Sequence, residues 1–240
     1  MPARLVGVVG SHPVVSAELM LRHKGIPYTR MDLPNMTHRV LLPLLRYRGT
    51  TVPVMTLDGR RISGTMRIAR ALDALRPDPP LFPAERGPVE GAEAWADAVL
   101  QDGVRQLSRF GVGKDPEAMR AFMAGAQMGA AGTVLKAALP VARPVVAFQM
   151  RVAGETARAC LEALPGQLDR VDALLADGVI GGAHPNAADF QIAPSVRLML
   201  LFDQLREPID ARPAGRHARA LVPEYPGRFR AVFPPEWVPF

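Results

Sequence analysis

The feature that most constrains the fold is the run from Thr51 to Met55, in which β-branched residues flank Pro53 and the turn dipeptide Asp58-Gly59 follows. Proline cannot donate to a strand ladder, so it stands at the first residue of a strand, at an edge or at a bulge. An X-Pro bond is also the peptide bond for which the cis form costs least. The run therefore predicts either an edge strand, or a strand opened by a cis proline that leaves the Val52 N–H and C=O able to bind an extended, peptide-like ligand.

The patterns before and after this run predict alternating strands and helices. A continuous apolar stretch indicates a central strand, helical periodicity ends at a Lys-Gly pair, and an alternating stretch follows, which together form a βαβ unit with parallel strands. After the proline strand, Asp58-Gly59 is placed as a hairpin turn, and Ser63-Gly64-Thr65 offers caps to an amphipathic helix. The expected elements are strands at 5–9, 27–33, 51–55 and 61–62, and helices at 14–23, 66–75 and, as a short one, within 35–47.

Composition and charge limit the class of protein. The 240 residues suffice for one large domain or two ordinary ones. The net charge of +6 permits nucleic-acid binding, but the arginines are dispersed among acidic residues, so we expect no nucleic-acid partner. Of the 29 basic residues only Lys24, Lys114 and Lys136 are lysines. This bias, with abundant alanine, glycine and proline, indicates GC-rich coding and a bacterial source.

The single cysteine and the apolar stretches bear on compartment. Cys160 excludes an internal disulfide and a cysteine-based metal cluster. It lies in a helical run, where we expect a buried, inert thiol in preference to a nucleophile. The longest apolar region, 121–135, is too short to span a bilayer, and the N-terminal pattern is not that of a signal peptide. We expect a cytoplasmic protein without membrane association.

The element order, with a proline opening the third strand, resembles the thioredoxin-like domain of glutathione S-transferases. The segment Pro80-Leu81-Phe82-Pro83 resembles that family's linker, and the remaining sequence has helical periodicity. The resemblance implies an α/β thioredoxin-like N-terminal domain over 1–79, a linker over 80–87 and an all-α C-terminal domain over 88–240 that supplies a hydrophobic substrate pocket. It favours a cis Pro53 and implies that the Val52 backbone pairs with the cysteinyl part of glutathione.

Ser11-His12-Pro13 resembles the Ser-x-Pro motif of serine-type members of the family. A thiol at a helix N-terminus is stabilised as the thiolate by the peptide dipoles and by a donated hydroxyl. The resemblance therefore implies that Ser11 is the catalytic hydroxyl, whereas the residues alone allow a turn or cap role equally well. His12 stands where cysteine-type members carry a nucleophile, so reductase activity through a mixed disulfide is disfavoured. His12 can contact a carboxylate of the thiol, although a solvated loop histidine is favoured.

Gly64-Thr65 occupies the place where family members present an acidic residue or glutamine and then a hydroxyl residue to the γ-glutamyl group. Thr65 keeps the hydroxyl at a helix N-terminus, which suits a carboxylate. Gly64 lacks the acidic partner, so a different thiol, such as mycothiol, stays open beside glutathione. Arg39, Arg46 and Arg48 can reach a glycyl carboxylate or can be solvated surface residues.

In the helical half, Asn186 and Asp189 match the family's capping box, and we expect Asp189 to be structural, not catalytic. Gly111-Val112-Gly113 is expected to interrupt a helix that reaches Phe110, and Pro165-Gly166 to bend or restart another. The apolar tail 233–240 is expected to pack back onto the protein. Residues that can line a pocket for an apolar electrophile, or simply pack in the core, are Phe110, Met119, Phe122, Met123, Met128, Phe148 and Met150.

Together these observations predict a two-domain protein similar to glutathione S-transferases, which conjugates glutathione or another bacterial thiol to a small hydrophobic electrophile without a metal. The resemblance further implies a homodimer. The alternative is a non-catalytic binding or interaction protein with the same fold.

Overall fold

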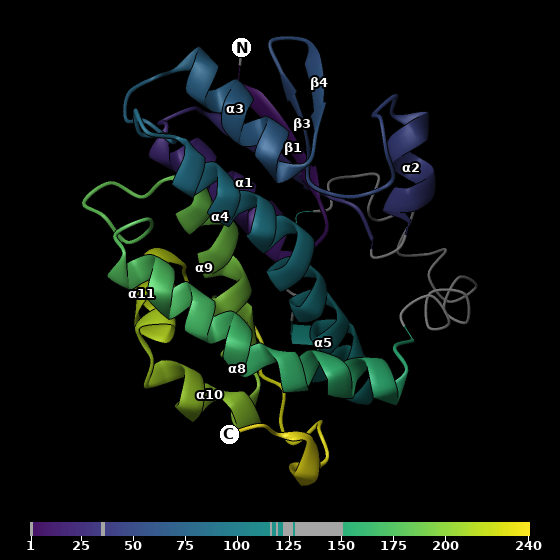
Figure 1. Ribbon diagram of the computed structural model, residues 1–240. Helices are drawn as coiled ribbons and strands as arrows, with labels where there is room; N and C mark the ends of the chain where they lie inside the picture. Colours follow the sequence, from purple (N-terminus) through teal and green to yellow (C-terminus); the bar gives the residue numbers. More distant parts are fainter. Residues whose placement is uncertain (1, 35–36, 116, 119, 122–126, 128–150) are drawn as a thin grey trace. The chain divides into compact units, whose positions relative to one another are not determined.

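The computed structural model describes residues 2–34, 37–115, 117–118, 120–121, 127 and 151–240 (Figure 1). The chain divides into two compact units, Met1–Leu81 with Gly125–Gln149, and Phe82–Ala124 with Met150–Phe240.

Unit 1 is built on a four-stranded mixed sheet with the order β2-β1-β3-β4. The predicted parallel pair is confirmed between β1 and β2, and β3 and β4 form the predicted hairpin, with β3 antiparallel to β1. β1 is central, as its continuous apolar run predicts. The strands are β1 (Ala3–Gly7), β2 (Tyr28–Asp32), β3 (Val54–Leu57) and β4 (Arg60–Ser63).

Three helices accompany the sheet: α1 (His12–His23), α2 (His38–Leu44) and α3 (Thr65–Leu75) (Figure 1). α1 and α3 pack against each other. Val6, Val8 and Val54 pack in one apolar cluster with Leu42 of α2 and Tyr47 after it. These alternating strand positions give one face of the sheet, because successive strand side chains point to opposite faces. The fold of this unit is thioredoxin-like, as predicted.

A buried lysine ties the end of α1 to the end of α3. The side chain of Lys24 has no exposed surface, and its Nζ donates to Asp73 Oδ1 at 2.7 Å, to the Arg76 carbonyl at 2.7 Å and to the Pro79 carbonyl at 2.5 Å. Arg76 reaches back and donates from Nη1 to the Lys24 carbonyl at 2.6 Å. The Lys24 and Arg76 side chains each bind backbone carbonyls at the end of the other helix. These hydrogen bonds hold the C-terminal ends of α1 and α3 together, along with the segment that follows α3. The sequence indicated only a basic helix end here.

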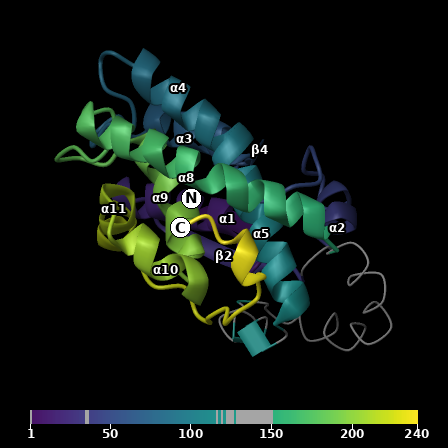
Figure 2. The same cartoon turned by 60° about the horizontal axis from the view of Figure 1, so that its bottom comes forward.

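In unit 2 the described regular elements are helical, apart from an isolated bridge between Phe202 and Phe229. α9 is its central helix: all of its residues are buried, and the continuous α4–η1–α5 helix packs along it (Figures 1 and 2). The elements are α4 (Gly87–Trp95), the π-helix η1 (Ala96–Leu100), α5 (Gln101–Lys114), α8 (Gly154–Ala176), α9 (Ala187–Met199), α10 (Asp203–Asp210), α11 (Pro213–Leu221) and the 3-10 helix η2 (Pro235–Trp237).

The expected interruption of one helix by its glycines is wrong, and of the expected bend or restart of another at Pro165-Gly166, the restart does not occur. α5 continues through its glycines to Lys114, and a Cβ at Gly111 would lie 2.8 Å from Cε1 of the buried Phe202. Gly111 is therefore explained by close packing within a helix. α8 likewise continues through Pro165 without a restart, since one lost backbone hydrogen bond does not outweigh the burial of this helix's apolar residues.

Two other expectations for the helical half are confirmed. Asn186 Oδ1 accepts the N–H of Ala188 and of Asp189, and Asp189 Oδ2 accepts the N–H of Asn186 at 2.8 Å, which completes the capping box. The C-terminal tail packs back: the Phe233 ring stacks on Phe110 and Phe202, with centroids 5.8 and 5.0 Å away.

Candidate functional site

The sheet register brings three candidate segments to one end of the sheet. Val54 pairs with Val6 on one side and with Ser63 on the other. This row crosses the carboxyl end of β1, the start of β3 and the end of β4. The loop to Ser11, the pair Val52-Pro53 and the pair Gly64-Thr65 all adjoin that row directly in sequence. The three segments that the sequence analysis identified therefore lie at the same end of the sheet.

Ser11 is the N-cap residue of α1. Its carbonyl oxygen accepts the N–H groups of Val14 at 3.0 Å and Val15 at 3.1 Å, but its side chain makes no capping hydrogen bond. The hydroxyl is half-buried and stands at the positive end of the α1 dipole. This position suits a group that donates to an anion at the helix N-terminus.

His12 is the first residue of α1 and is 4% exposed. The expectation of a solvated loop histidine is therefore wrong, because Pro13 at the next position lets the helix begin early and draws the histidine into the interior. Its carbonyl accepts the Ser16 hydroxyl at 3.1 Å. The contact of His12 with a thiol carboxylate stays a prediction.

Val52 and Pro53 precede β3, and the bond between them is cis, as the family resemblance favours. The Pro53 carbonyl accepts the Gly64 N–H at 3.0 Å, which joins two of the three candidate segments directly. The Val52 side chain is partly buried against the apolar cluster around Val6 and Val54. Its side chain is thus anchored on the sheet next to the start of β3.

Gly64 is the N-cap residue of α3, with φ of 90° and ψ of 144°. A Cβ here would meet nothing within 4 Å, so space does not require glycine. The positive φ does, because side-chain-bearing residues rarely adopt it. The absent acidic side chain thus coincides with a backbone conformation that favours glycine. Thr65 begins α3 and is 3% exposed.

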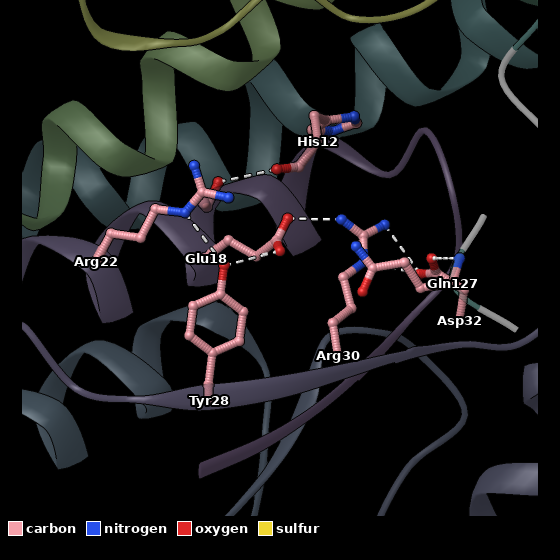
Figure 3. A network of polar contacts seen from close by, with 8 residues as sticks. His12, Glu18, Arg22, Tyr28, Arg30, Asp32 and Gln127 are labelled. Carbon is pink, nitrogen blue, oxygen red and sulfur yellow. Dashed lines mark hydrogen bonds and ion pairs between the residues drawn. The ribbon is translucent and has the colours of Figure 1, made fainter. Parts of the chain in front are cut away.

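A polar network that the sequence analysis missed lies between α1 and β2 (Figure 3). Arg30 Nη1 donates to Glu18 Oε2 at 2.6 Å, and Arg30 Nε donates to Asp32 Oδ1 at 3.0 Å. Tyr28 donates its hydroxyl to Glu18 Oε1 at 3.0 Å and accepts from Arg22 Nε at 3.2 Å. Burial raises the pKa of the Tyr28 hydroxyl. The available signal was the alternation of polar residues at positions 28, 30 and 32 on one strand face.

Asp32 extends this network to the same end of the sheet, since it pairs with Gly7 of β1. Its N–H donates to the Gln127 carbonyl and its Oδ2 accepts the Gln127 N–H, both at 2.9 Å. Asp32 is 2% exposed, whereas Gln127 is exposed, so these two hydrogen bonds lie at the boundary between the interior and solvent. The network therefore fixes α1, β2 and Gln127 to one another beside the candidate site.

The other sequence candidates lie elsewhere or outside the described residues. Arg39, Arg46 and Arg48 have exposed side chains on α2 and after it, and their role toward a carboxylate stays a prediction. Of the proposed pocket residues, Phe110 is buried in the aromatic cluster of the tail. The remaining ones, outside the described residues, are Met119, Phe122, Met123, Met128, Phe148 and Met150.

Cys160 is a free thiol on α8 and is only partly buried, so the expected full burial is wrong. Desolvation, with a smaller effect of the Asp102 charge, raises the pKa of this thiol. A raised pKa leaves less of the reactive thiolate near neutral pH, which agrees with the expected lack of nucleophilic reactivity.

Two further properties concern the part of the chain that the structure describes. Within it, none of the helices combines the length and apolarity that crossing a bilayer requires. Histidine, cysteine and carboxylate side chains there form no group of three or more that could hold a metal ion.

The fold and the site geometry define a thioredoxin-like domain followed by a helical unit. Residues 5–80 match the family model described as glutathione S-transferase, N-terminal domain. No match to a curated protein was found. Residues 5–80 therefore form, as the sequence predicts, a domain of the glutathione S-transferase N-terminal type, and the solved structures described next share the fold of the chain.

A glutathione S-transferase-like protein from Pseudomonas syringae has a TM-score of 0.59 and 18% identity, over 95% of this chain and 70% of that one. A glutathione S-transferase from Sinorhizobium meliloti has a TM-score of 0.58 and 15% identity, over 100% and 99%. One from Ceriporiopsis subvermispora, solved in complex with glutathione, has a TM-score of 0.54 and 19% identity, over 92% and 95%. At such identities the similarity shows a shared fold.

Proposed function

We propose that this protein binds glutathione, or another low-molecular-weight bacterial thiol such as mycothiol, at the carboxyl end of β1 and conjugates it to a small hydrophobic electrophile. The observation that carries the proposal is the row Val6–Val54–Ser63, because it gathers Ser11, Val52-Pro53 and Gly64-Thr65 at one edge. In this proposal residues 1–79 bind the thiol, 80–87 link, and 88–240 supply the pocket for the electrophile. The glutathione complex of a protein with this fold supports the choice of thiol.

Each candidate residue has a chemical role in the proposal. The Ser11 hydroxyl donates to the thiol sulfur at the N-terminus of α1, where the dipole is equivalent to about half a positive charge. Lowering a thiol pKa by about two units corresponds to about 2.7 kcal/mol and gives a largely ionised nucleophile near neutral pH. The Val52 backbone pairs with the cysteinyl part, and Thr65 at the α3 N-terminus receives the γ-glutamyl carboxylate. His12 contacts a carboxylate of the same thiol.

The second candidate function is non-catalytic binding by the same fold, and Gly64 favours it. At φ of 90° this position holds a glycine, so it offers no carboxylate to the amino group of a γ-glutamyl thiol. A site that binds the γ-glutamyl end of a thiol weakly can still bind a ligand without catalysing its conjugation.

The test is calorimetric binding of glutathione and, separately, of mycothiol to the purified chain. We expect one thiol to bind in the micromolar to millimolar range, and Thr65→Val to weaken that binding about tenfold or more, as loss of a charge-assisted hydrogen bond does. Thr29→Val is the matched control, because Thr29 is exposed on β2. Absence of binding by both thiols would refute the thiol site.

Turnover separates the two functions. Ser11→Ala should lower conjugation of the bound thiol to an aryl halide about a hundredfold, since positioned electrostatic donors contribute on that scale, while Ser108→Ala leaves it unchanged. Saturable thiol binding without turnover in the wild type would favour the binding function. Undiminished turnover in Ser11→Ala would remove Ser11 from the mechanism.

We further propose a homodimer in the bacterial cytoplasm with a role in detoxification. Sedimentation equilibrium of the purified chain tests the dimer, and a monomer at micromolar concentration would contradict it.

A further inference from the structure

Buried polar side chains occur on α5 and α9, two helices that pack against each other. Gln101 is 2% exposed, Gln191 1% and Ser195 0%. Buried polar atoms of a folded protein almost always have a hydrogen-bond partner. We therefore expect each of these three side chains to have a hydrogen-bond partner.

One of them is paired, and its pairing fixes how the helices run. Gln191 Nε2 donates to Asp97 Oδ1 at 2.9 Å. Further along both helices, Gly111 of α5 approaches Phe202, which follows α9. Residue numbers thus rise together on the two sides of the interface, so the helices run in the same direction. Gln101 and Ser195 each follow the Asp97–Gln191 pair by four residues and therefore lie at one level.

The π-helix η1 decides on which side of the interface Gln101 lies. In an α-helix a step of four residues overshoots a full turn by about 40°. For two parallel helices facing each other, equal overshoots would carry Gln101 and Ser195 to opposite sides of the interface. The hydrogen bonds of η1 join residues five apart, as from the Gln101 N–H to the Ala96 carbonyl. Its wider turn makes the step from Asp97 fall short of a full turn, which brings Gln101 to the same side as Ser195.

Both side chains retain a buried atom without a hydrogen bond. Among the described residues, Gln101 Nε2 and Ser195 Oγ have no hydrogen-bond partner. The amide offers donors, and the hydroxyl can donate or accept. A small molecule can accept a hydrogen bond from the Gln101 amide and donate to, or accept from, the Ser195 hydroxyl. Buried waters bind two to four polar partners in this way.

We propose that Gln101 and Ser195 form a buried polar site between α5 and α9 that binds one neutral, water-sized hydrogen-bonding molecule, which in dilute solution is water. The π-turn builds the site by aligning the amide with the hydroxyl. The site lies within unit 2 and is independent of the proposed thiol chemistry.

The test counts long-lived internal waters by oxygen-17 relaxation dispersion of the full chain. Gln101→Leu keeps a similar volume and removes the amide, so it should lose one such water relative to wild type. Adding Ser195→Ala to that variant should lose no further one. Gln106→Leu, at a half-buried position of α5, is the control and should keep the wild-type count.

An unchanged count in Gln101→Leu would overturn the proposal, because it would mean that no long-lived molecule depends on the Gln101 amide. Circular dichroism establishes that each variant folds. Gln101→Met replaces Gln101→Leu if the latter does not fold, with the same two outcomes.

Discussion

Nζ of Lys24 lies 2.7 Å from Oδ1 of Asp73, and the lysine side chain is fully buried while the aspartate is 18% exposed. Asp73 Oδ1 also accepts the Leu81 N–H at 2.8 Å. Together with the carbonyls of Arg76, Pro79 and, at 3.4 Å, Pro77, the carboxylate provides acceptors for all three ammonium protons. A buried charge in this state is costly to disturb, because removal of either partner leaves polar groups without compensation.

Lys24→Met is therefore expected to lower the free energy of unfolding by about 3 kcal/mol, the scale for breaking a buried ion pair from one side. Urea denaturation measures the change. Arg67→Met, at an exposed position of α3, is the control, with an expected change below about 0.5 kcal/mol. Equal stability of the two variants would show that the Lys24 contacts do not contribute to stability.

Gly7 sets how closely α1 approaches β1. A Cβ at this position would lie 2.7 Å from both Cγ atoms of Val14, so Gly7→Ala should destabilise the protein by about 1–3 kcal/mol through overpacking. Val14→Ala removes the clashing atoms. We expect the double variant Gly7→Ala/Val14→Ala to be less destabilised than the sum of the single variants, and strict additivity in thermal unfolding would contradict the proposed clash.

Two glycines of α5 offer a matched comparison. A Cβ at Gly113 would meet nothing within 4 Å, whereas one at Gly111 would meet Phe202 at 2.8 Å and Phe229 at 3.2 Å. Alanine in a helix is favoured over glycine by roughly 0.5–1 kcal/mol. Gly113→Ala should thus raise the midpoint of urea unfolding, and Gly111→Ala should lower it. A rise in both would mean that the aromatic rings adjust without cost.

The ion pair between Asp210 and Arg219 predicts a pH dependence. Hydrogen bonds from Arg219, one of them 2.6 Å long, lower the pKa of Asp210. A carboxylate whose folded pKa lies below its unfolded value of about 3.9 stabilises the fold above that pH, and this contribution is lost as the pH falls through the folded pKa. Both side chains are about a third exposed or more, so the contribution is about 0.5 kcal/mol.

Asp210→Asn should therefore be less stable than wild type at pH 7 and approach it below pH 3, as measured by thermal unfolding at both pH values. Asp177→Asn, at an exposed position, should show no loss of stability at pH 7. A stability difference for Asp210→Asn that stays constant with pH would rule out this linkage.

Local patterns predict the elements of unit 1 well. The proline before Val54, the Asp58-Gly59 turn and the alternation of β2 each act over a few residues, and the structure has the strands and the cis bond there. The location of the candidate site can be predicted as well, because the order of the strands determines which loops lie at the same end of the sheet. The capping box at Asn186 is a similarly local signal, and it forms as predicted.

Contacts between distant residues were not predictable in this way. Lys24 meets Asp73 after 49 residues, and Gly111 meets Phe202 across a helix interface. Periodicity reports which face of an element is apolar, not which partner covers it. The burial of His12 was missed because Pro13 reads as punctuation, yet at the second position of a helix it is well tolerated.

The ladder through Val6, Val54 and Ser63 also has an evolutionary consequence. Each loop that adjoins it is anchored by backbone pairing, which any residue except proline can supply. Substitutions in one loop therefore need not move the other two, so each part of the candidate site can diverge separately. Such modularity is consistent with one fold in chains that share only 15–19% identity with this one.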